Sequence, residues 1–302
     1  MSHFYFALTN PEADALLKEE VKSFYPELKL SYSRPGFLTF KANHPVFWKP
    51  LFARVSGTCL GRTKEEDLKM PRAWVWKRTD ALSIPDQLQE VSEKTLYKIG
   101  EQVTLIMMLN EDEFWVGEYP LTTTHFQTPG EVSSIQQVAA PSRAYYKIAE
   151  AYEAFDLPFD HMERVLELGS APGGASKFFL DQDMHVLGVD PAEMDPTVGK
   201  HIHFKHLKKA FETLEQNDFS KDVDWIICDI NLPPNIILKE IDRLLKFLEP
   251  RGMILTLKMN ETKHLHLLAD TVAHFKRKGY KKVELKYLPS HRQEIALIAL
   301  RS

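Results

Sequence analysis

Glu167-Leu168-Gly169-Ser170-Ala171-Pro172-Gly173-Gly174 is the segment from which the architecture of the C-terminal half can be argued. It follows the short run Arg164-Val165-Leu166 and precedes Ala175–Leu180, which predicts a strand, a tight glycine turn and the start of a helix. A glycine turn lets a ligand approach the backbone, and a helix N-terminus offers unpaired N–H groups. The strand expected at 186–190 ends in the carboxylate of Asp190. Together these features predict a nucleoside-binding unit.

Strands and helices alternate from Pro141 onward, which predicts an open, mostly parallel, Rossmann-like sheet with helices on both faces. No helix separates the last two strands, so we expect an antiparallel hairpin at the sheet edge. Helices are expected at 143–155, 236–248 and 264–278, and strands at 165–168, 186–190, 225–229, 253–257, 282–287 and 295–300. We therefore place one domain at 136–302.

Residues 1–135 are expected to form a separate N-terminal α+β domain, joined by a Thr-, Ser- and Pro-containing linker. A strand at 4–8, a helix from Pro11 to Tyr25 and a hairpin over 28–41 make half of a ferredoxin-like unit. A further helix is expected from His44, and a second hairpin over 102–119. Aromatic and basic residues alternate in one stretch, which is either an RNA-stacking surface or an inward-packed tryptophan with solvated cations: Trp74, Trp76, Lys77 and Arg78.

Charge is distributed unevenly along the 302 residues, although the net charge is only −4. Residues 258–302 carry ten Lys or Arg against four Asp or Glu, a net of +6. This basic region, together with Lys205–Lys209, either attracts a phosphate-bearing partner or is a solvated helix end and strand edge. The two cysteines are far apart and are expected to be reduced. With no secretory signal and no membrane span expected, we predict a cytoplasmic protein.

The glycine loop fits a relaxed dinucleotide fingerprint through Gly169, Ala171 and Gly174. Two residues argue against a dinucleotide. Pro172 removes an N–H donor that a pyrophosphate would use, and Glu167 adds a negative charge where phosphates would be repelled. A carboxylate there suits a cationic ligand such as the sulfonium of S-adenosylmethionine, with Asp190 holding the ribose hydroxyls.

Four ionisable residues are expected at one edge of the sheet. Asp229 and Lys258 end two parallel strands, Glu294 begins an antiparallel strand, and Lys147 lies in the preceding helix. Because ligands bind at the carboxyl ends of parallel strands, these side chains should converge beside the cofactor.

These residues carry a resemblance to the FtsJ/RrmJ-type RNA ribose 2′-O-methyltransferases, whose Lys-Asp-Lys-Glu tetrad matches Lys147, Asp229, Lys258 and Glu294 in order and setting. Further matching segments are Ser142-Arg143-Ala144-Tyr145-Tyr146-Lys147, the glycine loop, Asp190, and Met194-Asp195-Pro196 with Val198-Gly199. Leu288-Pro289-Ser290-His291-Arg292-Gln293-Glu294 is similar to the branch that methylates a cytidine ribose in bacterial large-subunit rRNA, whose members carry a THUMP-containing N-terminal extension.

The resemblance implies roles for individual residues. It makes Lys258 the base or hydroxyl polariser, Lys147 a second positioning cation, and Asp229 and Glu294 the groups that orient both lysines. It implies an S-adenosylmethionine site formed by Ser142, Glu167, Gly169, Ser170, Ala171, Pro172, Gly173, Gly174, Asp190, Pro191 and Asp229. Glu167 replaces the usual aspartate and retains its charge. An acid expected near the adenine is absent from Phe204–Phe211.

We therefore expect a monomeric, metal-independent enzyme that methylates RNA, most specifically rRNA, on a ribose 2′-hydroxyl. Two alternatives stay open. The relaxed fingerprint allows an NAD-dependent oxidoreductase, and the missing acid allows a non-catalytic RNA-binding protein on a methyltransferase scaffold.

Overall fold

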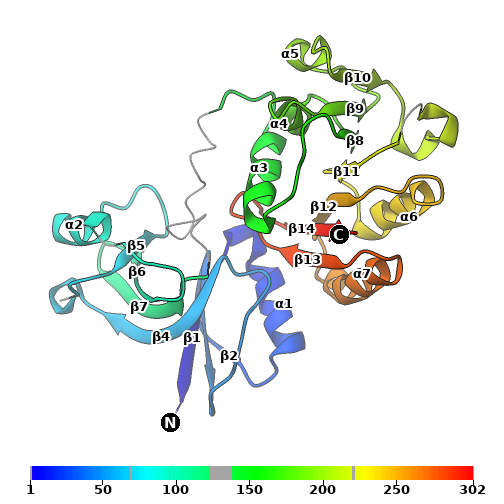
Figure 1. Ribbon diagram of the computed structural model, residues 1–302. Helices are drawn as coiled ribbons and strands as arrows, with labels where there is room; N and C mark the ends of the chain where they lie inside the picture. Colours follow the sequence, from blue (N-terminus) through cyan, green and yellow to red (C-terminus); the bar gives the residue numbers. More distant parts are fainter. Residues whose placement is uncertain (1, 69, 95, 123–137, 220–221, 302) are drawn as a thin grey trace. The chain divides into compact units, whose positions relative to one another are not determined.

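The computed structural model describes residues 2–68, 70–94, 96–122, 138–219 and 222–301 (Figure 1). The chain divides into two compact units, Met1–Val132 and Ser133–Ser302. The domain boundary and most of the linker expected from the sequence lie outside the described residues.

Unit 1 is built on a seven-stranded sheet with the strand order β2-β3-β1-β4-β7-β6-β5. Every pairing is antiparallel except that of β5 with β6. The expected hairpins are confirmed as β2–β3 and β6–β7. Its elements are β1 (His3–Leu8), η1 (Pro11–Ala13), α1 (Asp14–Phe24), β2 (Lys29–Arg34), β3 (Phe37–Ala42), β4 (Val55–Thr63), η2 (Glu65–Asp67), β5 (Trp74–Lys77), α2 (Asp86–Lys94), β6 (Gln102–Asn110) and β7 (Glu113–Pro120).

The prediction of a helix from His44 is wrong, because the segment between β3 and β4 is irregular. Pro50 cannot donate a helical hydrogen bond, and the segment is held by other contacts instead. Trp48 packs edge-on against Tyr5, and the buried carboxylate of Glu20 accepts from the N–H groups of Leu51 and Phe52.

The tryptophan-rich stretch of unit 1 forms the edge strand β5. Trp74 is buried in the core, whereas Trp76 is half-buried. Lys77 Nζ donates to the carbonyls of Asp80 and Leu82, and Arg78 Nε donates to that of Leu109. The first tryptophan is therefore a core residue, and both cations are engaged with the backbone.

Unit 2 has a second seven-stranded sheet, in the order β10-β9-β8-β11-β12-β14-β13. The Rossmann-like fold expected for this half is confirmed, although the sequence did not single out β10 as a strand. Its elements are α3 (Ala144–Phe155), β8 (Arg164–Leu168), α4 (Gly174–Leu180), β9 (His185–Val189), α5 (Pro196–Gly199), β10 (Phe204–Leu207), η4 (Phe211–Thr213), η5 (Gln216–Asp218), β11 (Trp225–Cys228), α6 (Pro234–Leu244), β12 (Gly252–Lys258), η6 (Thr262–His264), α7 (Leu265–Arg277), β13 (Lys282–Lys286) and β14 (Glu294–Leu300).

The last two strands form the expected antiparallel hairpin at the sheet edge, where β13 is the outer strand and β14 is the inner one. It is inserted between β12 and β13 and runs antiparallel to both. Every residue of β14 is buried, whereas β13 is largely half-buried. The continuous apolar run of β14 suits this inner position.

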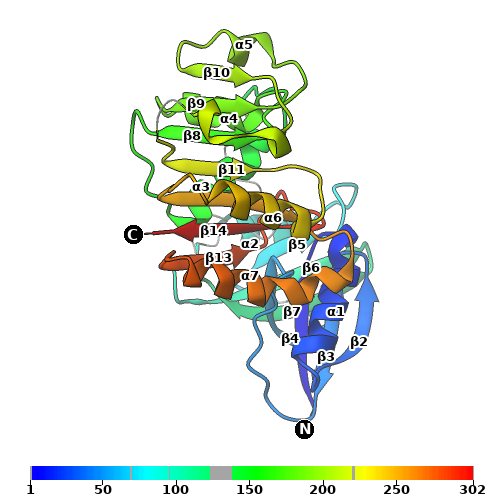
Figure 2. The same ribbon diagram turned by 90° about the vertical axis from the view of Figure 1, so that its right-hand side faces the viewer.

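Helices cover both faces of the unit 2 sheet. Side chains of α3, α4 and α5 pack with the strand residues Val165, Val186, Trp225, Ile227 and Ile254 in one buried cluster. Figure 2 shows α6 and α7 on the opposite face. The carboxyl ends of β8, β9, β11 and β12 therefore share one edge of the sheet, where the predicted site residues lie.

Candidate active site

The four residues of the predicted tetrad meet in a closed ring of ion pairs. Lys147 Nζ lies 3.0 Å from Asp229 Oδ2 and 2.8 Å from Glu294 Oε1. Lys258 Nζ lies 2.7 Å from Asp229 Oδ1 and 2.5 Å from Glu294 Oε2. Each lysine therefore bridges both carboxylates, and each carboxylate bridges both lysines. Two positive and two negative charges make the ring neutral overall.

Backbone pairing accounts for much of this arrangement. Lys258 and Glu294 are directly opposite each other at the ends of the antiparallel strands β12 and β14. Asp229 follows β11, the parallel neighbour of β12. Lys147 reaches the ring from α3. Between 10% and 15% of each of the four side chains is exposed, so the ring is mostly desolvated but can still be reached from solvent.

The charges of the ring shift two of its pKa values. Burial alone would lower the pKa of Lys258, but the carboxylates of Asp229 and Glu294 outweigh it and raise this pKa above its usual value. Burial would likewise raise the pKa of Glu294, but Lys147 and Lys258 hold it below its usual value. In the closed ring, Lys258 is therefore a firmly protonated ammonium group.

The glycine loop has few N–H groups left for a phosphate ligand. Gly169 N and Ser170 N both donate to Val189 O, at 2.9 and 3.3 Å. Ala171 N donates to Asp190 Oδ2 at 3.1 Å, and Pro172 has no N–H. The N–H groups of four successive loop residues are thus used or missing, which leaves a pyrophosphate fewer donors and argues against a dinucleotide.

Close packing fixes the loop against α3. Gly173 has a φ of +114°, which favours glycine. A Cβ atom on Gly174 would lie 2.1 Å from Ser142 Oγ and 2.8 Å from the Ser142 carbonyl oxygen. Ser142 Oγ also accepts from Ala144 N, at the start of α3. The predicted cofactor residue Ser142 therefore lies beside the loop, and the same helix presents Lys147 to the ring.

Asp190 follows β9 and organises the rim of the loop. Its second oxygen, Oδ1, accepts from Ala192 N at 2.8 Å, and the adjacent Pro191 is exposed. Beyond β10, Lys208 pairs with Glu193, and Lys209 Nζ lies 2.6 Å from Asp218 Oδ1. The segment Phe204–Phe211 contains no acidic residue. The carboxylates that pair with Lys208 and Lys209 come from other segments of the chain. Neither pairing could be predicted from the sequence.

Glu167 is buried beneath the loop, where Ser176 Oγ of α4 donates to Oε2. Burial raises the pKa of Glu167 to about 8, although the bond from Ser176 opposes the shift, and the charges of Asp229 and Asp190 add to it. The protonated form is thus favoured at neutral pH, so the expectation that Glu167 retains its charge does not hold in this structure. The reason is its burial beside two other carboxylates.

Glu167→Gln is expected to flatten the pH dependence of stability. Between the unfolded-state pKa of about 4.3 and the folded-state pKa of about 8, the folded protein binds more protons than the unfolded chain. The free energy of unfolding therefore falls as the pH rises through this window, and the amide removes that fall. Urea unfolding of both proteins from pH 5 to 8.5 measures the slope. An unchanged slope in the variant would contradict the assignment.

Part of the basic region near the C-terminus lies at the end of the strands opposite the tetrad. Lys282 and Gly252 are both paired with Leu300, so Lys282 lies at the same end of the sheet as the start of β12. The tetrad residue Lys258 lies at the other end of β12. These two strand ends are six residues apart, which is about 20 Å. Lys282 Nζ and Lys286 Nζ donate to the carbonyls of Phe155 and Ala154, at the C-terminus of α3. These two lysines therefore stabilise a helix end.

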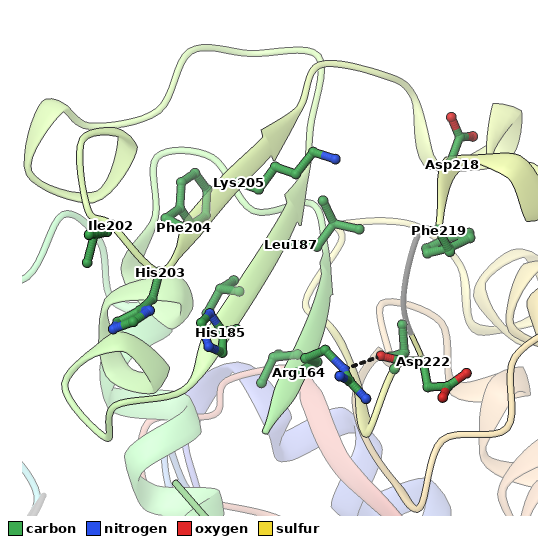
Figure 3. A pocket seen from close by; sticks show the side chains of 13 residues that line it. Arg164, His185, Leu187, Ile202, His203, Phe204, Lys205, Asp218, Phe219 and Asp222 are labelled. Carbon is green, nitrogen blue, oxygen red and sulfur yellow. Dashed lines mark hydrogen bonds between the residues drawn. The ribbon is translucent and has the colours of Figure 1, made fainter. Parts of the chain in front are cut away.

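A cavity of about 200 Å³ lies against β8, β9 and β10 (Figure 3). Arg164, His185, Leu187, Lys205 and Phe219 are among its lining residues. None of the predicted site residues lines it.

The residues that the structure describes include no group of three or more His, Cys, Asp or Glu side chains arranged to hold a metal ion. Within the same residues, none of the helices combines the length and apolar character that crossing a bilayer requires.

A family model described as FtsJ-like methyltransferase matches residues 140–291, which is half of the chain and includes the glycine loop, Lys147, Asp229 and Lys258. The chain belongs to the FtsJ-like methyltransferase family. S-adenosylmethionine is the methyl donor of this family, and membership does not favour the oxidoreductase or the non-catalytic alternative.

Relatives of this FtsJ-like protein match over part of their length. Ribosomal RNA large subunit methyltransferase M of Marinobacter nauticus is 28% identical over 192 residues, which are 61% of this chain and 51% of that protein. An uncharacterized protein of Methanocaldococcus jannaschii is 30% identical over 123 residues, or 40% of this chain and 35% of that protein. The chain thus spans about a third to a half of the length of these relatives.

Structural likeness to solved proteins is weaker. Fibrillarin of Aeropyrum pernix, solved with S-adenosyl-L-methionine, has a TM-score of 0.40 at 14% identity and covers 68% of this chain and 84% of its own. TrmN from Thermus thermophilus has a TM-score of 0.36 at 13% identity, over 99% of this chain and 100% of its own. The family assignment rests on the sequence.

Proposed function

We propose that this protein transfers a methyl group from S-adenosylmethionine to a ribose 2′-hydroxyl of RNA, with rRNA as the substrate class. The observation that carries the proposal is the closed ring of Lys147, Asp229, Lys258 and Glu294 at the same sheet edge as the glycine loop. Membership of the FtsJ-like family supports the cofactor. The names of the relatives support rRNA as the substrate.

The chemistry of the loop fits a cationic cofactor. Asp190 lies close enough to Glu167 for its charge to raise the pKa of that residue, and this carboxylate gives the rim of the loop a negative field. Such a field attracts a sulfonium group and repels phosphates. When bound, S-adenosylmethionine supplies an electrophilic methyl group on sulfur. Gly169–Gly174 and Asp190 then hold the nucleoside part, and Ser142 and Pro191 line the same site.

The ring prepares the acceptor hydroxyl. A ribose hydroxyl is a weak nucleophile and has to lose its proton as the new O–C bond forms. The raised pKa of Lys258 favours the role of hydroxyl polariser, in which the ammonium group stabilises the charge that develops on oxygen. In that role the O–C bond forms as the bond from sulfur to the methyl group breaks, the hydroxyl proton passes to solvent, and S-adenosylhomocysteine is the leaving group. The role of base becomes available only if Asp229 or Glu294 moves away and lets that pKa fall. In the closed ring, Lys147 contacts both carboxylates.

The remaining functional assignments follow from this activity. RNA is the partner, and unit 1 is a THUMP-type extension that presents RNA to unit 2. Trp76 is half-buried and is the aromatic residue of β5 available for base stacking. The protein acts in the cytoplasm, as a monomer and without a metal ion.

Calorimetry tests the cofactor assignment. S-adenosylhomocysteine is expected to bind with a stoichiometry of one, whereas NADH is expected to give no heat of binding, because the loop N–H groups at residues 169–171 are already bonded. Binding of NADH in place of S-adenosylhomocysteine would overturn the proposed function.

A further inference from the structure

Residues Tyr287–Gln293 form the turn between β13 and β14 and directly precede the tetrad residue Glu294. It has little regular secondary structure, yet several hydrogen bonds hold it. Tyr287 Oη donates to Arg292 O at 2.7 Å, and Met259 N, next to Lys258, donates to Gln293 O at 2.7 Å. Inside the turn, His291 is fully buried and its Nδ1 accepts from Leu288 N. The position of Glu294 therefore depends on the turn before it.

Glu150 of α3 ties this turn to the helix that carries Lys147. Its side chain is completely buried, and Oε2 accepts from Ser290 N at 2.9 Å. Glu150 lies three residues after Lys147, so both side chains leave the same face of α3. Lys147 contacts the side chain of Glu294, and Glu150 contacts the backbone four residues earlier. The helix thus holds the turn at two points.

The C-terminal end of α3 is fixed to β13 as well. Lys282 and Lys286 donate to its last carbonyls, and Figure 1 shows α3 beside β13 and β14. Helix, strand and turn therefore form a rigid corner. Glu150 is the completely buried acidic side chain of this corner.

We propose that Glu150 is a positioning residue of the tetrad, which fixes the turn Tyr287–Gln293 through Ser290 N–H and so sets the distance of Glu294 from both lysines. The expected effect of Glu150 on methyl transfer rests on the proposed function, whereas the hydrogen bond from Ser290 N–H to Glu150 does not. Loss of Glu150 lets Glu294 move away from Lys258. A misplacement of about 1 Å at a reacting group can cost on the order of 100-fold in rate.

The test compares Glu150→Ala and Glu150→Gln with Glu163→Ala in the 302-residue chain. Glu163 is a matched control, because it is also a mostly buried carboxylate of unit 2, bonded to Trp225 Nε1 and paired with Arg251. It directly precedes β8, at the edge opposite the tetrad. Amide hydrogen exchange over residues 287–293 is the first readout, and kcat, KM and the pH profile of methyl transfer are the second.

Glu150→Ala is expected to speed exchange in the turn and to lower kcat about 10- to 100-fold with little change in the KM for the cofactor. Because an anion moves away from Lys258, the alkaline limb of the pH profile should shift to lower pH. Glu150→Gln keeps an acceptor oxygen and should restore much of the rate, and Glu163→Ala should change neither readout.

Unchanged exchange in the turn of Glu150→Ala would overturn the proposal, and so would faster exchange with an unchanged kcat. An equal loss of kcat in Glu163→Ala would also overturn it. If Glu150→Ala does not fold, Glu150→Gln alone decides. Faster exchange in the turn together with an alkaline limb at lower pH would support the proposal, and wild-type behaviour in both measurements would overturn it. If no RNA is methylated by the wild-type protein, the proposed function fails, and exchange in the turn still decides the structural role of Glu150.

Discussion

Lys258→Ala is expected to lower methyl transfer by about 10²- to 10⁴-fold, the usual contribution of a proton-transfer or polarising group. The variant removes the ammonium group that faces both Asp229 and Glu294, whereas the loop that binds the cofactor is left in place. Binding of S-adenosylhomocysteine should therefore change little. Single-turnover kinetics on an RNA substrate that lacks the methyl group, together with calorimetry, separates the two effects.

Two companion variants sharpen this result. Lys258→Arg keeps the positive charge but cannot act as a base near neutral pH, so it should retain more turnover than Lys258→Ala if Lys258 polarises the hydroxyl. Lys177→Ala removes a lysine that pairs with Asp181 on α4 and should have no effect. Breaking a buried ion pair can also cost about 3–5 kcal/mol of stability, so rates are compared per folded molecule. Normal turnover in Lys258→Ala would contradict the role of the ring.

Gly174→Ala is expected to weaken cofactor binding and to destabilise unit 2. The new Cβ would lie 2.1 Å from Ser142 Oγ and 2.8 Å from Ser142 O, so the start of α3 has to move away from the loop. Overpacking of this kind costs about 1–3 kcal/mol. If the strain is relieved by opening the loop, the Kd for S-adenosylhomocysteine rises roughly 5- to 150-fold.

Gly199→Ala is the matched control for this substitution. A Cβ on Gly199 would meet only Met194, at an ordinary 3.6 Å, and its φ is not in the left-handed region. Calorimetry and thermal unfolding of both variants measure the difference. Equal behaviour of the two variants would show that the close approach of loop and helix at Gly174 is unimportant.

Much of unit 2 could be predicted because its elements alternate and its strands are apolar. The strand end at Asp229, the strand end at Lys258 and the strand start at Glu294 follow from hydrophobic runs bounded by polar residues. Parallel strands bring such ends to one edge, so a common location could be predicted before any geometry was known. That each lysine bridges both carboxylates could not, because side-chain pairing depends on register and on the angle of α3.

Other features escaped sequence reasoning for identifiable reasons. The strand β10 is short, and its residues include lysine and histidine, so hydrophobic periodicity does not mark it. The insertion of β14 between β12 and β13 depends on long-range pairing. The protonated state of Glu167 depends on burial beside Asp229 and Asp190, which come from other strands. The irregular segment after β3 is stabilised by Trp48 and Glu20, and this tertiary contact overrides local helix propensity.

The most direct test of the proposed activity is to identify the atom that receives the methyl group. Ribosomal RNA that lacks the modification is incubated with isotope-labelled S-adenosylmethionine and either the wild-type protein or Lys258→Ala, digested to nucleosides and analysed by mass spectrometry. The predicted result is label in a 2′-O-methyl nucleoside with the wild-type protein and only a trace with the variant. Label on a nucleobase, or equal ribose labelling by both proteins, would contradict a ribose methyltransferase that works through this tetrad.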